Sequence, residues 1–301
     1  MTKVKHMKQG SLIVLAAGLL SMPVLADEQV NKTIDASPDG FVEIYNTSGS
    51  IQVTAWKQSK VEVKGTLGDS VEELIFERDG DEVLIRVEVP NRHWGDIDAD
   101  LQIKVPEDSS LEVSAVSADI EVEYVLGKQS LESVSGDIET LGVANDVEAA
   151  SVSGDIEIKG DDGEGDFEAA TVSGDIFIMS LSGTVDVESV SGDVDILGGR
   201  FDDVHFESVN GDQNFAAALI DGGDLSAESV NGSVEIEFSE PVSASFDIET
   251  FNGSIRNCFG PKPERTSKYS PGLELRFETG DGDSNVEIET LNGSVTICVD
   301  D

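Results

Sequence analysis

The residues of this sequence with the clearest chemical potential are carboxylates that recur one position after a repeated glycine. If they stack on neighbouring turns of the chain, like charges lie ~5 Å apart and repel by about 1 kcal/mol each even in water. Salt screening, shifted carboxylate pKa values or bound divalent cations such as Ca²⁺ would relieve that repulsion. The series is Asp119, Asp137, Asp155, Asp175, Asp193 and Asp212.

This series has two interpretations. The first is a solvated acidic face, or Asp side chains that accept backbone N–H groups at a corner. The second is a weak, multi-site cation ladder formed by Asp137, Asp155, Asp175 and Asp193. The sequence has no 12-residue EF-hand loop, so we predict no resident cofactor and keep weak Ca²⁺ binding open. A second acidic column is predicted to face outward: Glu132, Glu188, Glu207, Glu228, Glu249 and Glu289.

Catalytic chemistry finds little support. His93 and His205 have no second ligand or nucleophile nearby in the sequence, and no GxSxG or P-loop string occurs. A polysaccharide-active β-helix enzyme would need one convergent pair of carboxylates, or a basic residue in a groove. Here the acidic residues recur in every repeat, which is typical of a structural role and not of a single catalytic site. We predict no catalytic residues and keep such an enzyme as the alternative.

The charge balance excludes several partners. The chain has 61 Asp and Glu against 19 Lys and Arg, a formal net charge of -42 in 301 residues. Nucleic acid and anionic membrane surfaces would be repelled by such a protein. The partner is therefore expected to be an envelope protein or a surface polymer of unknown identity.

Residues 1–26 are typical of a secretory signal peptide. Lys3, Lys5 and Lys8 precede an apolar run, and the small-residue site Val24-Leu25-Ala26 follows. The run is too short for a membrane span. Removal of this segment leaves 16 Lys and Arg against 61 Asp and Glu, a net charge of -45. We predict an exported protein of the periplasm or the cell surface.

The elements that position the carboxylates form an internal repeat. The hexapeptide SVSGDI, or a close variant such as SVNGSV, recurs at spacings of 18 to 21 residues with one gap of 40. Such periods predict a solenoid. The first copy has Ala118 at the central position, and the other copies have glycine. We expect these glycines to supply a positive φ at corners: Gly136, Gly154, Gly174, Gly192, Gly211, Gly232, Gly253 and Gly293.

Apolar residues alternate with polar ones on both sides of each glycine, which predicts strands with one buried face. We expect inward columns seven, five and two residues before the glycine, and two and four after it. For the glycine at 192 these are Val185, Val187, Val190, Val194 and Ile196. Gln213 and Asn257 also fall on inward columns and need polar partners. The amides of Asn210, Asn231, Asn252 and Asn292 are expected to form a ladder.

The sequence therefore predicts an all-β, single-chain parallel β-solenoid (β-helix) with 18–21 residues per coil. The hand is expected to be right, from the general bias of parallel crossovers. Residues 27–110 are expected to form an irregular β section that caps the solenoid, and residues 111–301 the repeats, with an excursion at 259–283.

The two cysteines, Cys258 and Cys298, each follow their glycine by five residues. Equivalent positions on neighbouring coils lie within the Cα distance that a disulfide needs. We predict a disulfide on the outer face, stapling the last coil. If a full coil intervenes, the thiols stay free.

The layout resembles that of the bacterial putative-adhesin family of β-strand repeat proteins, a domain of unknown function. The resemblance covers nearly all of the chain after residue 26. It implies an exported, non-enzymatic surface or envelope protein. We expect the long, flat acidic faces of the predicted solenoid to bind a partner or a surface polymer. The stretches that carry the resemblance are NTSGSIQVTAW (Asn46–Trp56), IKVPEDSSLEV (Ile103–Val113), the SVSGDI/SVNGSV series and VEIETLNGSVTI (Val286–Ile297).

Overall fold

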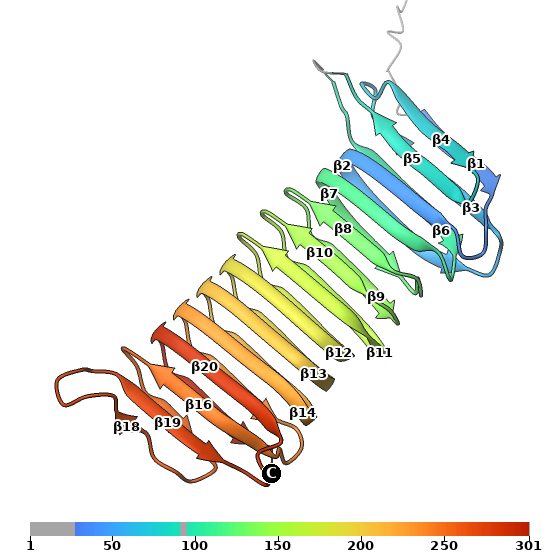
Figure 1. Cartoon of the computed structure of the whole chain (residues 1–301). Helices are drawn as coiled ribbons and strands as arrows, with labels where there is room; N and C mark the ends of the chain where they lie inside the picture. Colours follow the sequence, from blue (N-terminus) through green and yellow to red (C-terminus); the bar gives the residue numbers. More distant parts are fainter. Residues whose placement is uncertain (1–27, 91–94, 301) are drawn as a thin grey trace, which may run out of the picture.

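The computed structural model describes residues 28–90 and 95–300, with no side-chain description for residue 162. The signal peptide predicted at 1–26 and His93 lie outside the described residues. In the described ranges the chain contains strands and no helix (Figure 1). The strands are β1 (Glu28–Asp35), β2 (Phe41–Trp56), β3 (Lys60–Leu67), β4 (Glu73–Asp79), β5 (Glu82–Glu88), β6 (Ala99–Pro106), β7 (Ser110–Glu123), β8 (Gln129–Ser133), β9 (Ile138–Val143), β10 (Val147–Ser151), β11 (Ile156–Thr171), β12 (Ile176–Ser191), β13 (Val194–Asn210), β14 (Gln213–Asn231), β15 (Val234–Phe238), β16 (Ala244–Thr250), β17 (Ile255–Asn257), β18 (Glu264–Arg265), β19 (Leu273–Glu278), β20 (Ser284–Asn292) and β21 (Val295–Val299).

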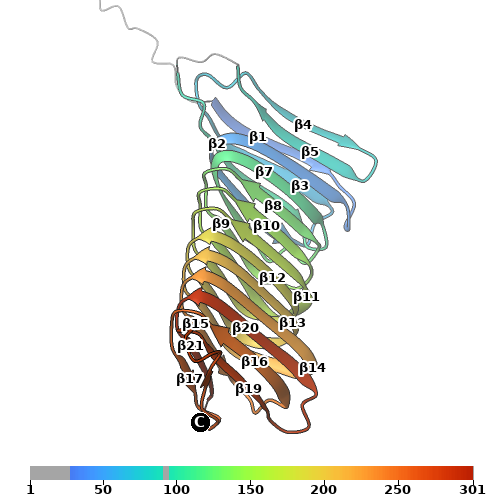
Figure 2. The same ribbon diagram turned by 60° about the vertical axis from the view of Figure 1, so that its left-hand side comes forward.

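The repeats stack as the coils of a β-solenoid-like fold. Figure 2 shows the stack from a second direction. The segment before each corner glycine pairs in parallel with its equivalent in the next coil, as in Val147↔Phe167 and Phe167↔Val185. The segment after the glycine does the same, as in Ile156↔Ile176. We call the sheet of segments before the glycine the first face, and the sheet of segments after it the second face. The hand of the coil stays a prediction.

The core lies between the two faces. Four of the five expected inward columns are buried, and Val185, Val187, Val194 and Ile196 are at most 1% exposed. Phenylalanines extend this core through the C-terminal half. Phe206, Phe215, Phe238 and Phe246 follow one another with ring centroids 6.1 to 6.4 Å apart. Apolar burial of this kind is the main favourable term in folding.

The fifth expected column is not in the core, and that prediction is wrong. Val152, Val172 and Val190, two residues before their glycines, lie beside one another but are 44 to 46% exposed. Side chains alternate along a strand. Positions seven and five before the glycine share one side, and position two lies on the other. The inward place belongs instead to the Ser or Thr three residues before the glycine.

The corner glycines are required mainly by close packing. Among the eight predicted corners, Gly192 and Gly211 have positive φ values, both 152°. A Cβ on Gly136 would lie against the carbonyl oxygen of Ala118, and a Cβ on Gly293 against that of Gly232, well inside van der Waals contact. Successive coils therefore approach so closely at the corner that only glycine fits. The expected role of positive φ applies to a minority of the corners.

Each corner also carries a hydrogen-bond ladder along the stack. The Asp137 backbone N–H donates to Asp119 Oδ1 at 3.1 Å, and the same bond recurs up to the Ser233 N–H and Asp212 Oδ1 at 2.7 Å. Farther along, Asn231 Nδ2 donates to Asn210 Oδ1 at 3.0 Å. The bonds then run from Asn292 to Asn231 and from Asn252 to Asn292. The expected amide ladder is therefore present.

At the N-terminal end the coils are stacked out of sequence order. β2 pairs with β7 on one side and with β5 and β6 on the other. β3 to β6 come between β2 and β7 in the sequence, but β2 and β7 are neighbours in the stack. Gly49 of β2 is in register with Ala118 of β7, so residues 41–56 form a copy of the repeat. Three antiparallel pairings extend the sheet beyond this point (Figure 1): β4 pairs with β5, β3 pairs with β6, and β1 pairs with β3. The division of the chain at residue 110 stays a prediction.

The C-terminal end is also interleaved. β20 pairs with β14 on one side and with β16 on the other, so the last coil of the sequence inserts between the two coils that precede it. The segment 259–283 holds β18 and β19, and β19 pairs antiparallel with β16 at the end of the stack. Because of the insertion, Cys258 and Cys298 lie on adjacent coils with their Cα atoms 4.9 Å apart, and they form the predicted disulfide.

Candidate binding groove

The outer side of the first face carries a row of exposed apolar side chains, one from each coil. They occupy the position two residues before each corner, where strand alternation turns them away from the core. Their exposed fractions lie between 40 and 49%. We call this row the aliphatic stripe; in spatial order it consists of Val116, Val134, Val152, Val172, Val190, Val209, Val230, Leu291 and Phe251.

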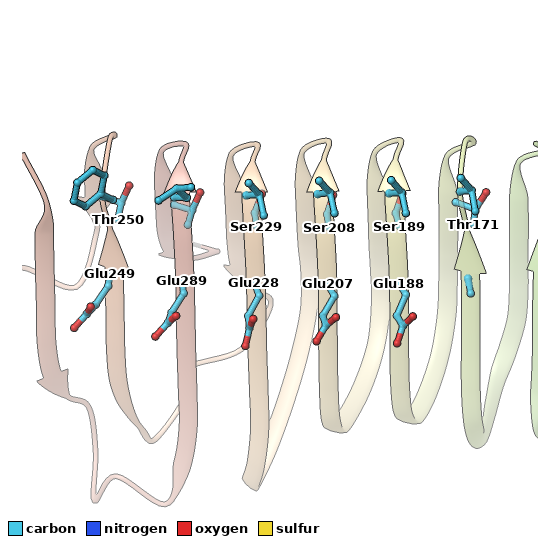
Figure 3. A pocket seen from close by; sticks show the side chains of 18 of the residues that line it. Thr171, Glu188, Ser189, Glu207, Ser208, Glu228, Ser229, Glu249, Thr250 and Glu289 are labelled. Atoms are coloured by element: carbon cyan, nitrogen blue, oxygen red, sulfur yellow. The ribbon is translucent and has the colours of Figure 1, made fainter. Parts of the chain in front are cut away.

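A row of carboxylates runs beside the stripe, two residues earlier on each strand. In the coil order of the stack these are Glu188, Glu207, Glu228, Glu289 and Glu249, and we call them the glutamate ladder. Figure 3 shows the five side chains aligned across successive strands, with the buried Ser189, Ser208, Ser229 and Thr250 nearer the corner. In the two coils before Glu188 the same position holds Ala170 and Ala150.

The glutamate ladder and six residues of the aliphatic stripe, from Val172 to Phe251, line one groove with a volume of about 690 Å³. It crosses the strands from Ser151 to Thr250, and Thr266 and Gly272 of the segment after β17 line it beside Thr250. The groove therefore runs along the stack and combines an apolar track with an acidic one.

The acidic track is mostly without cationic partners in the described part of the chain. At its C-terminal end, Arg276 of β19 donates to Asp247 at 2.9 Å, to Glu249 at 2.6 Å and to Glu274 at 3.1 Å. His205 Nε2 lies 3.2 Å from Glu207 Oε1. Burial raises the pKa of Glu289, and the carboxylates of Glu228, Glu287 and Glu249 raise it further. The ladder thus keeps an unneutralised charge at its centre.

The buried hydroxyls under the groove fall into two groups. Thr250 Oγ1 donates to the carbonyl of Gly293 at 2.9 Å, and Thr290 Oγ1 to that of Gly232 at 3.3 Å. The hydroxyls of Ser189, Ser208 and Ser229 have no hydrogen-bond partner in the structure. They lie under the middle of the groove, where the glutamate ladder is continuous.

The other predicted residues are placed as follows. The carboxylates of the proposed cation ladder, Asp137, Asp155, Asp175 and Asp193, each accept a backbone N–H from the next coil. Among the described residues, no three His, Cys, Asp or Glu side chains gather as a metal-binding group. Cation binding by these residues stays a prediction.

The two polar residues expected on inward columns differ. Gln213 is 1% exposed and its Nε2 donates to the Glu228 carbonyl at 2.9 Å, while its Oε1 has no partner. Asn257 is half-buried; its Nδ2 donates to the Pro261 carbonyl at 3.1 Å, and its Oδ1 accepts the Phe259 N–H.

Sequence reasoning missed the aliphatic stripe, although the signal was present. Positions five and two before the glycine differ by an odd number, so they face opposite sides of a continuous strand. From Glu188 onward, each coil contributes the same kinds of side chain to the groove: a Glu, a buried Ser or Thr, and an exposed apolar residue. This arrangement suits extended contact with a long, repetitive partner surface.

The chain is similar to several solved structures at 10 to 11% sequence identity. A putative cell adhesion protein from Clostridium sporogenes is aligned over 91% of this chain and 100% of its own, with a TM-score of 0.21. A putative adhesin from Bacteroides fragilis is aligned over 91% of this chain and 97% of its own, with a TM-score of 0.46. A putative adhesin from Parabacteroides distasonis is aligned over 90% of this chain and 97% of its own, with a TM-score of 0.38.

No curated protein matches the sequence. Within residues 28–90 and 95–300, no helix is long and apolar enough to cross a membrane. The family model of Toastrack DUF4097 matches residues 40–298, which includes every coil of the stack. The chain belongs to the Toastrack DUF4097 family.

Proposed function

We propose that the protein is exported and acts, without catalysis, as an adhesin-like scaffold that binds a partner in the cell envelope or at the cell surface. The observation that carries the proposal is the aliphatic stripe, which exposes one apolar side chain on each of nine successive coils. Soluble proteins rarely expose a contiguous apolar patch of this extent unless it is a binding site. A solenoid is suited to this role, since stacking repeats builds a long, continuous surface.

Two further features support export. The N-terminal sequence has the layout of a secretory signal. The disulfide between Cys258 and Cys298 is of a kind that persists in oxidising compartments. A non-catalytic role is supported by the repetition in the groove, because enzymes place a single set of acid and base groups at one point.

The test combines location with contact. Native cells are fractionated and their surface is shaved with protease to place the protein. A photo-cross-linking residue replaces Val209 on the stripe in one variant and Glu235 on the second face in the matched control. The proposal expects an exported protein that cross-links a distinct partner from position 209 and not from position 235. Retention in the cytoplasm, or equal cross-linking from both faces, would overturn it.

The absence of catalysis has its own test. Incubation with acidic polysaccharides is expected to release no reducing or unsaturated sugar ends. Release of such ends by the purified protein, lost when Glu207 and Glu228 are changed to Gln, would replace the proposed scaffold by an enzyme.

A further inference from the structure

We propose that the groove takes a cationic amphipathic α-helix of a partner protein, laid along the stack. Its apolar side chains would contact the aliphatic stripe, and its Lys or Arg side chains the glutamate ladder. This inference rests on the proposed binding function and names the chemistry of the partner. Four observations carry it: the charge of the groove, the contacts of Arg276, the spacing of the coils, and the exposure of the stripe.

The charge of the groove selects a cationic partner. The glutamate ladder holds five carboxylates on adjacent coils, in a chain with a formal net charge of -42. Nucleic acid and anionic lipid are repelled by this field. A second copy of the chain would bring another acidic face against the ladder. A partner with basic side chains gains favourable contacts with the ladder and relieves the repulsion between its members.

Arg276 shows within the chain how the groove binds a cation. β19 pairs antiparallel with β16 beyond the last repeat of the first face, and its Arg276 lies opposite Asp247. The guanidinium contacts both oxygens of Asp247 and reaches Glu249, which lies two residues later on the same strand. Arginine suits such planar, multidentate contacts with carboxylates.

The same pair of acids, two residues apart on the outer side, recurs on other coils. Asp186 and Glu188 form one such pair on β12, and Glu287 and Glu289 form another on β20. Neither pair makes a salt bridge in the described residues. These are positions at which basic side chains of a partner could repeat the contact of Arg276.

The spacing of the coils favours a helix. Neighbouring strands, and so neighbouring stripe residues, are ~4.8 Å apart. A helix presents side chains on one face about every 5.4 Å, so the mismatch is only about 0.6 Å per turn. An extended peptide repeats on one side every ~6.8 Å and loses register within two coils. The groove spans seven coils, from Ser151 to Thr250. That length is ~29 Å, or about 19 helical residues.

The stripe supplies the apolar half of the site. Val190, Val209 and Val230 are 40 to 44% exposed and lie at the centre of the groove, next to the glutamate ladder. Amphipathic helices bind in apolar grooves through residues at i, i+3, i+4 and i+7. The proposed helix would place those residues on the stripe and its basic residues toward the ladder.

The experiment uses the exported, disulfide-bonded protein and a synthetic 19-residue peptide as probe. The peptide has Leu at helical spacing on one side and Lys and Arg along the adjacent side. Two control peptides are used: one has the same composition in a permuted order that removes the amphipathic pattern, and one has Glu in place of every basic residue. Fluorescence anisotropy of the labelled peptides measures the dissociation constants at low and at physiological salt.

The variants separate the two halves of the site. Glu207→Gln with Glu228→Gln is expected to weaken binding of the amphipathic peptide by about fivefold or more. Val209→Ser with Val230→Ser is expected to weaken it by about tenfold. The matched control, Glu235→Gln with Glu237→Gln, removes the same charge from the exposed second face of β15 and should change the dissociation constant by less than about twofold.

Each outcome decides the inference. Tight binding of the amphipathic peptide alone, weakened by the two groove variants and not by the control, supports it. Equal binding of the permuted peptide, equal weakening by the second-face variant, or no binding of the amphipathic peptide overturns it. If the peptide does not bind while position 209 still cross-links a native partner, the helix is wrong and the scaffold function stands. If both fail, both proposals fall.

Discussion

Val187 and Val190 lie three residues apart on β12 and end on opposite sides of it. Val187 is fully buried and Val190 is 44% exposed. Their side chains are identical, so hydrophobicity does not decide which one enters the core. Side chains alternate between the two faces of a strand, and the two valines are an odd number of residues apart. The second valine therefore points outward. The comparison between the core columns and the aliphatic stripe separates apolar residues that fold the chain from apolar residues that are free to bind.

The largest expected difference between the core columns and the aliphatic stripe is the loss of stability when a side chain is truncated to alanine. Phe206→Ala on β13 removes a fully buried ring and is expected to lower the free energy of unfolding by about 3–5 kcal/mol. Val209→Ala, three residues later on the same strand, is expected to lower it by less than about 0.5 kcal/mol. Urea denaturation of the two variants measures both values. A loss of more than about 2 kcal/mol for Val209→Ala would place the stripe in the core.

The second effect concerns the interleaved C-terminal end. The disulfide joins the inserted coil to its neighbour across 40 residues of sequence. Replacing both cysteines, Cys258→Ser with Cys298→Ser, is expected to lower the free energy of unfolding by about 2–4 kcal/mol. Hydrogen exchange should show β20 and β21 losing protection first, while β11 to β13 keep theirs. A uniform loss along the stack would show that the end is no weaker than the centre without its disulfide.

A smaller effect compares the buried hydroxyls under the groove. Thr250→Val removes the hydroxyl that donates to Gly293 and is expected to cost about 1 kcal/mol. Ser208→Ala removes a hydroxyl without a partner and should be neutral or slightly stabilising. Thermal unfolding of both variants measures the difference. Equal costs would show that the Ser208 hydroxyl has a hydrogen-bond partner in solution.

The smallest effect concerns the charge of the ladder. The pKa of Glu289 is raised above its ordinary value of 4.5 by burial and by neighbouring carboxylates. The folded state therefore binds more protons there than the unfolded state, so stability falls as pH rises through this range. The full penalty is present above the folded-state pKa and is absent below the unfolded value.

Glu289→Gln should therefore stabilise the protein at pH 7 by a few tenths of a kcal/mol, since solvent screens this exposed group. The gain should disappear below about pH 4. Chemical denaturation at pH 7 and pH 4 measures it, with Glu235→Gln on the second face as the charge-matched control. A gain at pH 7 no larger than that of the control would contradict the repulsion within the ladder.

Much of the stack could be predicted from the sequence because one motif repeats at nearly constant spacing. The glycine positions set the register, and the columns of Val185, Val187, Val194 and Ile196 follow from alternation. The disulfide followed from equal offsets of Cys258 and Cys298 from their glycines. The amide ladder followed from the repeated Asn-Gly pair.

The rest depends on information that the repeat does not carry. The order of the coils at each end is set by long-range pairing, and no local residue pattern indicates that β20 inserts between β14 and β16. Taken together with the other apolar residues before each glycine, the valine of the aliphatic stripe is predicted to face the core. At the corner, however, the smaller Ser189 takes the buried place, and Val190 turns outward.

The most direct test compares the reactivity of introduced cysteines at a buried and an exposed position on the neighbouring strands β12 and β13. Val187→Cys and Val209→Cys are each introduced beside the native disulfide and treated with a thiol-alkylating reagent under native conditions. We expect rapid alkylation at position 209 and protection at position 187. The amphipathic peptide should slow alkylation at position 209, and its permuted control should not. Protection of position 209 without peptide, or equal rates at both positions, would contradict it.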